Sequence, residues 1–318
     1  MTPALLDRLF AAPADAEAVE HVRQWWPLHR ALAGDWQAPI DRSIAGGFAA
    51  DRVAWAFGAG YQGALRALDP SLPDAAIACL CVTEANGNAP RNIASTLVPR
   101  EDGFALSGRK KWSTLGPEGT LLLVAARLPD ADAQGRPRIR VARVNAAARG
   151  VRIESMPPTR FVPELPHAEV HLDDVAVAAS DVLEGDGYLR VVKPFRSIED
   201  IHVNAAVLAY LLREARRLRW PAAWLAEAVQ TLVSFHALAG LDPARAATHV
   251  ALEGVLAAAR RLAQAADAHF AARADSAAAA RWQRDRSLFG VASAARARRF
   301  ASACAALGLP EPPAAAAP

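Results

Sequence analysis

The hydrophobic period of this 318-residue chain changes twice, and that pattern constrains the fold more than any other feature. Residues 1 to about 75 place apolar residues three and four apart, which predicts helices. From about 76 to 182 the apolar residues alternate in short runs between turn residues, which predicts β-strands. After Gly185 the helical period returns and holds to about residue 308. The chain is therefore predicted to place a β-rich segment between two helical ones.

These segments predict an α+β protein with three domains and a tail. Short joins between the last four helical runs, such as Pro221, are typical of an antiparallel bundle. Dense short strands favour a compact antiparallel barrel or sandwich. The predicted units are a helical N-terminal domain at 1–75, a β-barrel at 76–184, a C-terminal four-helix bundle at 185–309 and a disordered tail at 310–318.

Composition argues against several classes of protein. The net charge is only +3, and the arginines are spread along alanine-rich helices, so we expect solvated helix faces and no nucleic-acid partner. Cys79, Cys81 and Cys304 are too few for a disulfide framework, and a lone C-x-C pair favours small core residues over zinc. No stretch approaches the ~20 apolar residues of a membrane span. The N-terminus lacks a signal-peptide core, so a cytoplasmic protein is expected.

The stretch C-V-T-E-A-N-G-N-A-P, over residues 81–90, raises a separate question. An apolar run typical of a buried strand ends at Thr83 and Glu84 and is followed by a long loop rich in asparagine, glycine and proline. A strand reversal needs only a short turn. The segment is therefore either a generous surface loop or a loop whose backbone N–H groups face a ligand, since amide-lined concavities bind anions.

Three motifs in order resemble those of the acyl-CoA dehydrogenase family. The loop at 81–90 resembles the family's C-V-T-E-P-G-A-G-S-D, and S-G-R-K-K-W-S-T-L at 107–115 resembles its N-G-x-K-x-W-I-T-N. Residues 170–177 and 182–188 resemble the segments that close its barrel. No single motif would suffice, but their order and spacing together indicate a shortened, divergent member. The family's helical domain, β-barrel and four-helix bundle match the predicted order.

The resemblance implies a flavoprotein oxidoreductase that holds FAD and removes two hydrogens from an acyl-CoA or a carrier-bound acyl thioester. Val82 and Thr83 would line the pyrimidine side of the flavin. Trp112 would lie against the isoalloxazine, and Thr114 near its N5 and O4 edge. The cofactor-contacting positions that the resemblance implies are Val82, Thr83, Asn88, Ala89, Trp112, Ser113 and Thr114.

The loop also departs from the family pattern. Asn88-Ala89-Pro90 replaces Gly-Ser-Asp, which removes one hydroxyl, and Pro90 lacks a backbone N–H. Asn86, Gly87 and Asn88 can still adopt positive φ and present amides, so the loop could bind through its backbone alone. The alternative is a barrel-rim loop that has lost its ligand.

The family's reaction needs a carboxylate that removes the α-proton of the thioester. The common C-terminal position of that glutamate has no counterpart, since W-Q-R-D-R-S-L-F-G-V-A-S at 282–293 contains none. Some branches carry the base in the first bundle helix, where the resemblance implies Glu199, with Asp200 as the alternative. An ordinary helix start, with acids favoured by the helix dipole, explains the same pair.

Other residues receive plainer interpretations. His167 and His171 are spread along one strand face and are not expected to bind a metal. Arg109, Lys110 and Lys111 could meet phosphates but are expected to be solvated.

The family segments that reach FAD from a partner chain have no counterpart in this sequence, so the barrel would hold FAD. Two alternatives remain: a catalytically degenerate homologue that binds a thioester or partner, and one subunit of a hetero-oligomeric dehydrogenase. Either a homo- or a hetero-oligomer is expected, and the sequence does not indicate the electron acceptor.

Overall fold

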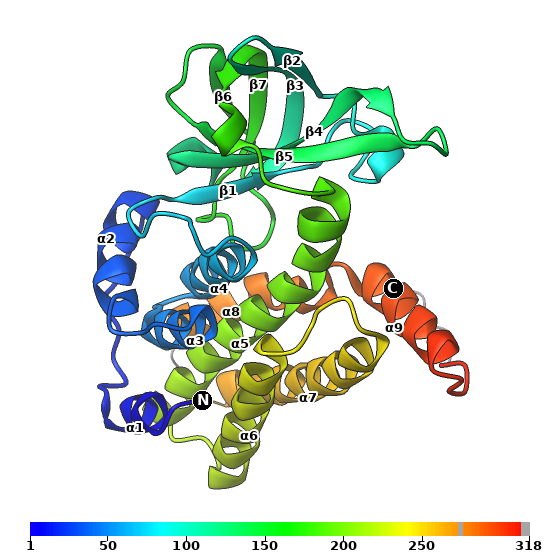
Figure 1. Cartoon of the computed structure of the whole chain (residues 1–318). Coiled ribbons are helices and arrows are strands. Elements are labelled where there is room, and N and C mark those ends of the chain that lie inside the picture. Colours follow the sequence, from blue (N-terminus) through cyan, green and yellow to red (C-terminus); the bar gives the residue numbers. More distant parts are fainter. Residues whose placement is uncertain (273–275, 313–318) are drawn as a thin grey trace.

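The computed structural model describes residues 1–272 and 276–312, and it places a curled sheet against a layer of helices (Figure 1). Four helices precede the sheet: α1 (Pro3–Ala11), α2 (Val22–Ala33), α3 (Pro39–Ala49) and α4 (Val53–Leu68). Five follow it: α5 (Lys193–Arg217), α6 (Ala222–Ala239), α7 (Ala246–Ala271), α8 (Ser276–Asp285) and α9 (Ser293–Ala306). The predicted order of helices, strands and helices is confirmed; the exact domain boundaries stay a prediction.

The sheet is mixed, so the prediction of a wholly antiparallel barrel is wrong. Its strands are β1 (Ala78–Cys81), β2 (Thr96–Arg100), β3 (Gly103–Thr114), β4 (Leu121–Ala131), β5 (Pro137–Asn145), β6 (Val151–Ser155) and β7 (His167–Val177). Their order is β1-β4-β2-β3-β7-β6, with β5 beside β4. β1 and β2 both run parallel to β4, and the remaining pairs are antiparallel. Alternating hydrophobicity shows which residues face inward, but it does not reveal strand direction.

The sheet is also open within the described residues, because β1, β5 and β6 each pair with a single other strand. The strands therefore form a curled half-barrel. Its concave interior is filled by apolar side chains such as Leu106, Val124 and Val170, all fully buried.

The fourth predicted bundle helix is interrupted, which corrects the expectation of one continuous helix. α8 ends at Asp285, a 3₁₀ turn covers Arg286–Gly290, and α9 begins at Ser293. Ala292 has φ of 63°, and a left-handed residue cannot continue a right-handed helix. The predicted disordered tail at 310–318 lies mostly outside the described residues, which end at 312.

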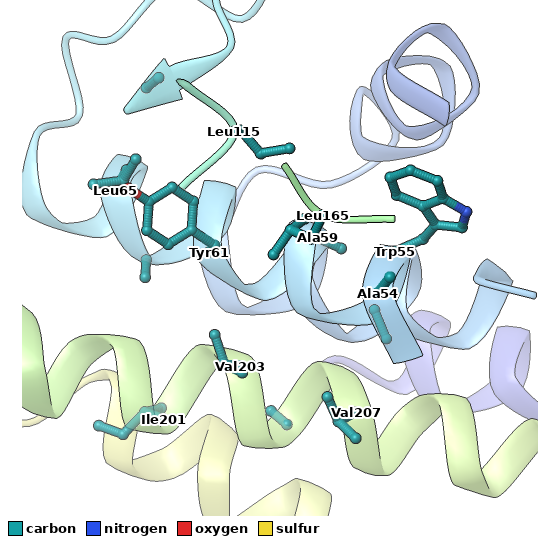
Figure 2. Packing of buried hydrophobic residues seen from close by; sticks show 14 of the residues in the cluster. Ala54, Trp55, Ala59, Tyr61, Leu65, Leu115, Leu165, Ile201, Val203 and Val207 are labelled. Carbon is teal, nitrogen blue, oxygen red and sulfur yellow. The ribbon is translucent and has the colours of Figure 1, made fainter. Parts of the chain in front are cut away.

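Helix α4 joins the sheet to the rest of the molecule. Its side chains pack between Leu115 and Leu165 from the sheet region and Val203 from α5 (Figure 2). Gly60 allows the close approach of the two helices, because a Cβ there would lie 2.5 Å from the Cα of Val203. This packing fixes the position of α5, and so of Glu199, relative to the sheet.

Two compositional expectations have structural counterparts. Cys79, Cys81 and Cys304 are unpaired and buried, which confirms them as core residues. Among the helices of the described residues, none combines the length and the apolar character that crossing a bilayer requires.

Candidate functional site

The Asn-rich loop is anchored at its base by a buried ion pair. Glu84 Oε1 accepts hydrogen bonds from Lys110 Nζ at 2.6 Å and from Ser95 Oγ at 2.7 Å, while Oε2 accepts from the Ala94 amide at 2.8 Å. Burial would raise the pKa of Glu84, but the hydrogen bond and charge of Lys110 outweigh it and hold that pKa below its ordinary value. Lys110 has no exposed side-chain surface, so its expected solvation is wrong.

The other two basic residues of that motif lie at the surface. Arg109 is paired with Glu169, and Lys111 Nζ lies 2.9 Å from the same carboxylate. Only the middle residue of the basic run therefore turns inward, as the alternation of a strand requires.

At the loop tip, Glu84 and Gly87 exchange both backbone hydrogen bonds, at 3.0 and 2.9 Å, in a tight turn. Gly87 is the one residue of 86–88 with positive φ, at 98°, a conformation that favours glycine. A 3₁₀ turn follows at Pro90–Asn92. Between these turns, the backbone N–H groups of Asn88 and Ala89 donate to no group in the described part of the chain. Two adjacent amides are thus free to bind a ligand.

Trp112 lies beside this loop on a distorted part of β3. Thr83 O accepts a hydrogen bond from the Lys111 amide at 2.8 Å, which joins the start of the loop to the same strand. The pairing of β3 with β7 is irregular between Lys110 and Ser113, and Trp112 there has φ of 58°. Its indole is 52% exposed and packs edge-on against His167 at 6.0 Å. The bulge therefore turns a large aromatic surface outward.

The remaining cofactor positions differ in what they offer. Val82 belongs to the buried hydrophobic cluster. Ser113 is fully buried and its Oγ donates to Cys81 Sγ at 3.3 Å, so its hydroxyl faces the interior. Thr114 ends β3 and is partly exposed. Of this group, Thr114 has the side chain that a bound ligand could reach.

Glu199 lies on the second turn of α5 without a hydrogen-bond or ion-pair partner in residues 1–272 and 276–312. It is partly exposed, yet the dense protein around it raises the pKa of its carboxyl to about 7, and Asp200 adds to that shift. It borders a cavity of about 110 Å³. The cavity is also lined by Asp200, Asn204 and Arg296, and its apolar lining residues are Phe57, Val203, Val207, Leu288, Phe289, Val291 and Ala292.

Asp200 has the opposite environment. One carboxylate oxygen accepts from Arg296 at 2.7 and 2.9 Å, and the other lies 2.8 Å from Arg299, so both are engaged by α9. Its two oxygens are thus occupied by arginine donors and are not free to face a substrate. Of the two candidate bases, Glu199 is the one whose environment suits proton transfer.

The loop and the helix that carries Glu199 are in direct contact. Arg196 Nη2 donates to Asn88 Oδ1 at 2.9 Å, and Arg196 lies one helical turn before Glu199. The structure thus brings the loop at Asn88 against the helix that carries Glu199, although the two are far apart in the sequence. Arg196, Glu84 and Lys110 were not singled out from the sequence as functional residues. The Arg–Glu spacing of three within the helix was an available signal, because it places both residues on one face.

A group of metal-ligand residues occurs elsewhere on the sheet, where Glu154, Glu169 and His171 lie close together. Arg152 is paired with Glu154, while Arg109 and Lys111 are paired with Glu169. Both carboxylates are therefore already neutralised by side-chain cations, and the group does not form a convincing metal centre.

The residues around the loop fit a flavin nucleotide. Free amides and a guanidinium suit an anionic phosphate chain, and an exposed indole suits a flat ring. Gly87 leaves room for close approach, since a Cβ there would meet nothing nearer than 3.6 Å. The donor set therefore agrees with the type of cofactor that the resemblance implies.

Comparison with known protein families tests the resemblance to the acyl-CoA dehydrogenases. Residues 79–175 match the model of the acyl-CoA dehydrogenase middle domain. The centre of this chain is therefore similar to an acyl-CoA dehydrogenase middle domain. The loop, the Glu84–Lys110 pair and Trp112 all belong to this middle domain, and the resemblance inferred from three motifs is confirmed. No curated protein matches the chain.

Solved structures show that the similarity of fold extends beyond the middle domain. Butyryl-CoA dehydrogenase from Megasphaera elsdenii is 14% identical, with a TM-score of 0.72 over 96% of this chain and 99% of that one. Glutaryl-CoA dehydrogenase from Mycobacterium smegmatis is also 14% identical, with a TM-score of 0.66 over 96% and 93%. A structure of PigA with FAD and proline is 15% identical, with a TM-score of 0.68 over 97% and 98%. These matches establish the acyl-CoA dehydrogenase fold.

Proposed function

We propose that this protein is an FAD-dependent oxidoreductase that introduces an α,β double bond into an acyl thioester. The observation that carries the proposal is the state of Glu199. In the described structure it is a carboxyl without a hydrogen-bond or ion-pair partner, and its pKa is raised to about 7. It borders a cavity lined mainly by apolar side chains, and it lies one helical turn from a residue that contacts the Asn-rich loop. A perturbed carboxyl in such a place is a recognised mark of a catalytic base.

The chemistry assigned to Glu199 is removal of the α-proton. A base with a pKa near the operating pH is substantially ionised yet still basic enough to accept a proton, which is the favourable compromise for general-base catalysis. The apolar side chains around it, including Phe57 and Val203, exclude water from the proton-transfer path. FAD, when bound, supplies the acceptor for the hydride that leaves the β-carbon.

Cofactor binding is assigned to the middle domain. The free amides of Asn88 and Ala89 would receive the phosphates, and the exposed indole of Trp112 would cover the ring. Thr83, whose backbone oxygen is hydrogen-bonded to the Lys111 amide, and Thr114, which lies two residues after Trp112, would border the ring edge. Val82 would contribute through its backbone, because its side chain belongs to the core.

Flavin binding and base function are tested separately. The purified protein should be yellow, or should take up added FAD with quenching of flavin fluorescence. Glu199→Gln should retain FAD while the rate of flavin reduction by a panel of acyl-CoA thioesters falls by about 10²–10⁴-fold. Glu184→Gln is the matched control, because Glu184 is an exposed acid outside the Glu199 cavity. Full activity of Glu199→Gln would overturn the assignment of the base.

A second candidate is a catalytically degenerate homologue or one subunit of a hetero-oligomeric dehydrogenase. It is favoured by Ala89 and Pro90, which remove a hydroxyl and an amide donor from the loop. A protein that stays colourless with added FAD, and whose measured binding is unchanged by Glu199→Gln, would support it. Co-purification with a longer homologue would identify the hetero-oligomer, whereas a homodimer that holds FAD would exclude it.

A further inference from the structure

Arg196 lies on α5 where this helix contacts the Asn-rich loop, and the loop engages only part of its guanidinium N–H groups. Its Nη2 donates to Asn88 Oδ1 at 2.9 Å. Its Nε and Nη1 groups have no partner within the described ranges, and the residue is exposed. The guanidinium is therefore oriented by the loop while most of its hydrogen-bonding capacity remains free.

Residues 86–90 of the loop beside it carry no positive charge, and Arg91, the next residue, belongs to the 3₁₀ turn that follows. Asn88 and Ala89 offer two neutral amides, the Ala89 side chain is a methyl group, and Pro90 has no N–H. A flavin diphosphate carries about two negative charges, which neutral amides alone solvate incompletely. A guanidinium can supply both charge and paired donors in the geometry that phosphate oxygens accept.

We infer that Arg196 binds the diphosphate of the flavin nucleotide and takes over from the donors that Ala89 and Pro90 do not provide. The Arg196–Asn88 contact places this cation at the loop tip. The inference rests on the proposed function. It makes α5 a shared element, since one face of its first two turns holds both the cofactor cation and the base Glu199.

The anchoring of the loop makes the inference testable without loss of the fold. The conformation of the loop base is set by Glu84 with Lys110 and Ser95, and that of its tip by the Glu84–Gly87 turn. None of these contacts involves Arg196. Replacing Arg196 should therefore leave the loop in place and remove only the cation.

The test measures FAD affinity and the unfolding temperature of the FAD-free protein for the wild type, Arg196→Gln and Arg196→Lys. Arg196→Gln should raise the Kd for FAD about tenfold or more and leave the unfolding temperature unchanged. Arg196→Lys, which keeps the charge but not the paired donors, should fall between them. Arg100→Gln is the matched control, because Arg100 is an exposed arginine paired with Asp174 at the β2–β3 hairpin.

Riboflavin, which has no phosphate, separates this role from a general effect on the site. Its affinity should be the same in the wild type and Arg196→Gln. An unchanged Kd for FAD, or equal losses for FAD and riboflavin, would overturn the assignment of Arg196 while leaving the proposed function standing. A wild-type protein that binds neither flavin would overturn the proposed function, and this inference with it.

Discussion

Glu84 and Glu199 show how differently one residue type is used in two regions of this molecule. In the middle domain, Glu84 is buried, accepts four hydrogen bonds and has a lowered pKa. On α5, Glu199 has no partner in the described structure and a pKa raised to about 7. The first acid holds a loop in shape, and the second is kept available for a proton. The surrounding protein desolvates both carboxyls, so it is the presence of partners that gives their pKa values opposite shifts.

The largest expected effect comes from breaking the structural pair. Lys110→Met leaves Glu84 buried without its cation, and this should lower the free energy of unfolding by about 3–5 kcal/mol. Lys111→Met is the control, because that lysine is partly exposed and pairs at the surface, where a loss below about 1 kcal/mol is expected. Equal losses in urea unfolding would show that the Glu84–Lys110 pair is not structural.

A smaller loss of stability is expected at Asp200. This residue is next to Glu199 in the sequence, but like Glu84 it is paired with cations. Asp200→Asn leaves Arg296 and Arg299 without their carboxylate, and stability should fall by about 1–3 kcal/mol. Limited proteolysis should then cut α9 faster than in the wild type. The exposed Asp130→Asn should change neither readout, and an unaltered cleavage rate for Asp200→Asn would contradict the assigned anchoring of α9.

The availability of Glu199 should appear in the pH dependence of stability. Its pKa is about 7 in the folded protein against an ordinary 4.5, so between these values the folded state binds more protons than the unfolded state. Stability should therefore decline as pH rises through this window, by roughly 1–2 kcal/mol. Glu199→Gln should abolish that part of the decline. Parallel pH profiles for the two proteins would refute a raised pKa.

The smallest effect on stability is expected at Trp112, which lies in the middle domain but is assigned to ligand binding. Trp112→Gly removes an exposed ring and relieves a left-handed backbone, so unfolding should change by less than about 1 kcal/mol. FAD affinity should fall nonetheless. A loss of more than about 2 kcal/mol would mean that the indole is structural and that its exposure is incidental.

The sequence indicated the order of elements and the position of the loop, because both depend on local periodicity and turn residues. The parallel direction of β1 relative to β4 was not predicted. It depends on how the chain segments between the two strands are folded, which the local pattern of each strand does not reveal. The break before α9 was missed although Gly290 offered a signal.

Within the site, the sequence led to Glu199 and the Asn-rich loop but misjudged Lys110. That lysine shares strand parity with the buried Leu106, so alternation alone could have placed it inside, facing the glutamate of the C-V-T-E motif. The Arg196–Asn88 contact could not be foreseen, because it depends on how α5 packs beneath the sheet. Val82 and Ser113 remain predictions as cofactor contacts, although their side chains face the core.

The two arginines of α9 give the far end of the chain a chemical influence on Glu199. Arg296 and Arg299 pair with Asp200, and the charge of Arg296 lowers the pKa of Glu199 against burial and the charge of Asp200, which raise it. Undocking α9 would withdraw the Arg296 cation and would also admit water to the cavity, and these two changes move the pKa of Glu199 in opposite directions. The docking of this one helix therefore connects the last described helix of the chain to the ionisation of a carboxyl on α5.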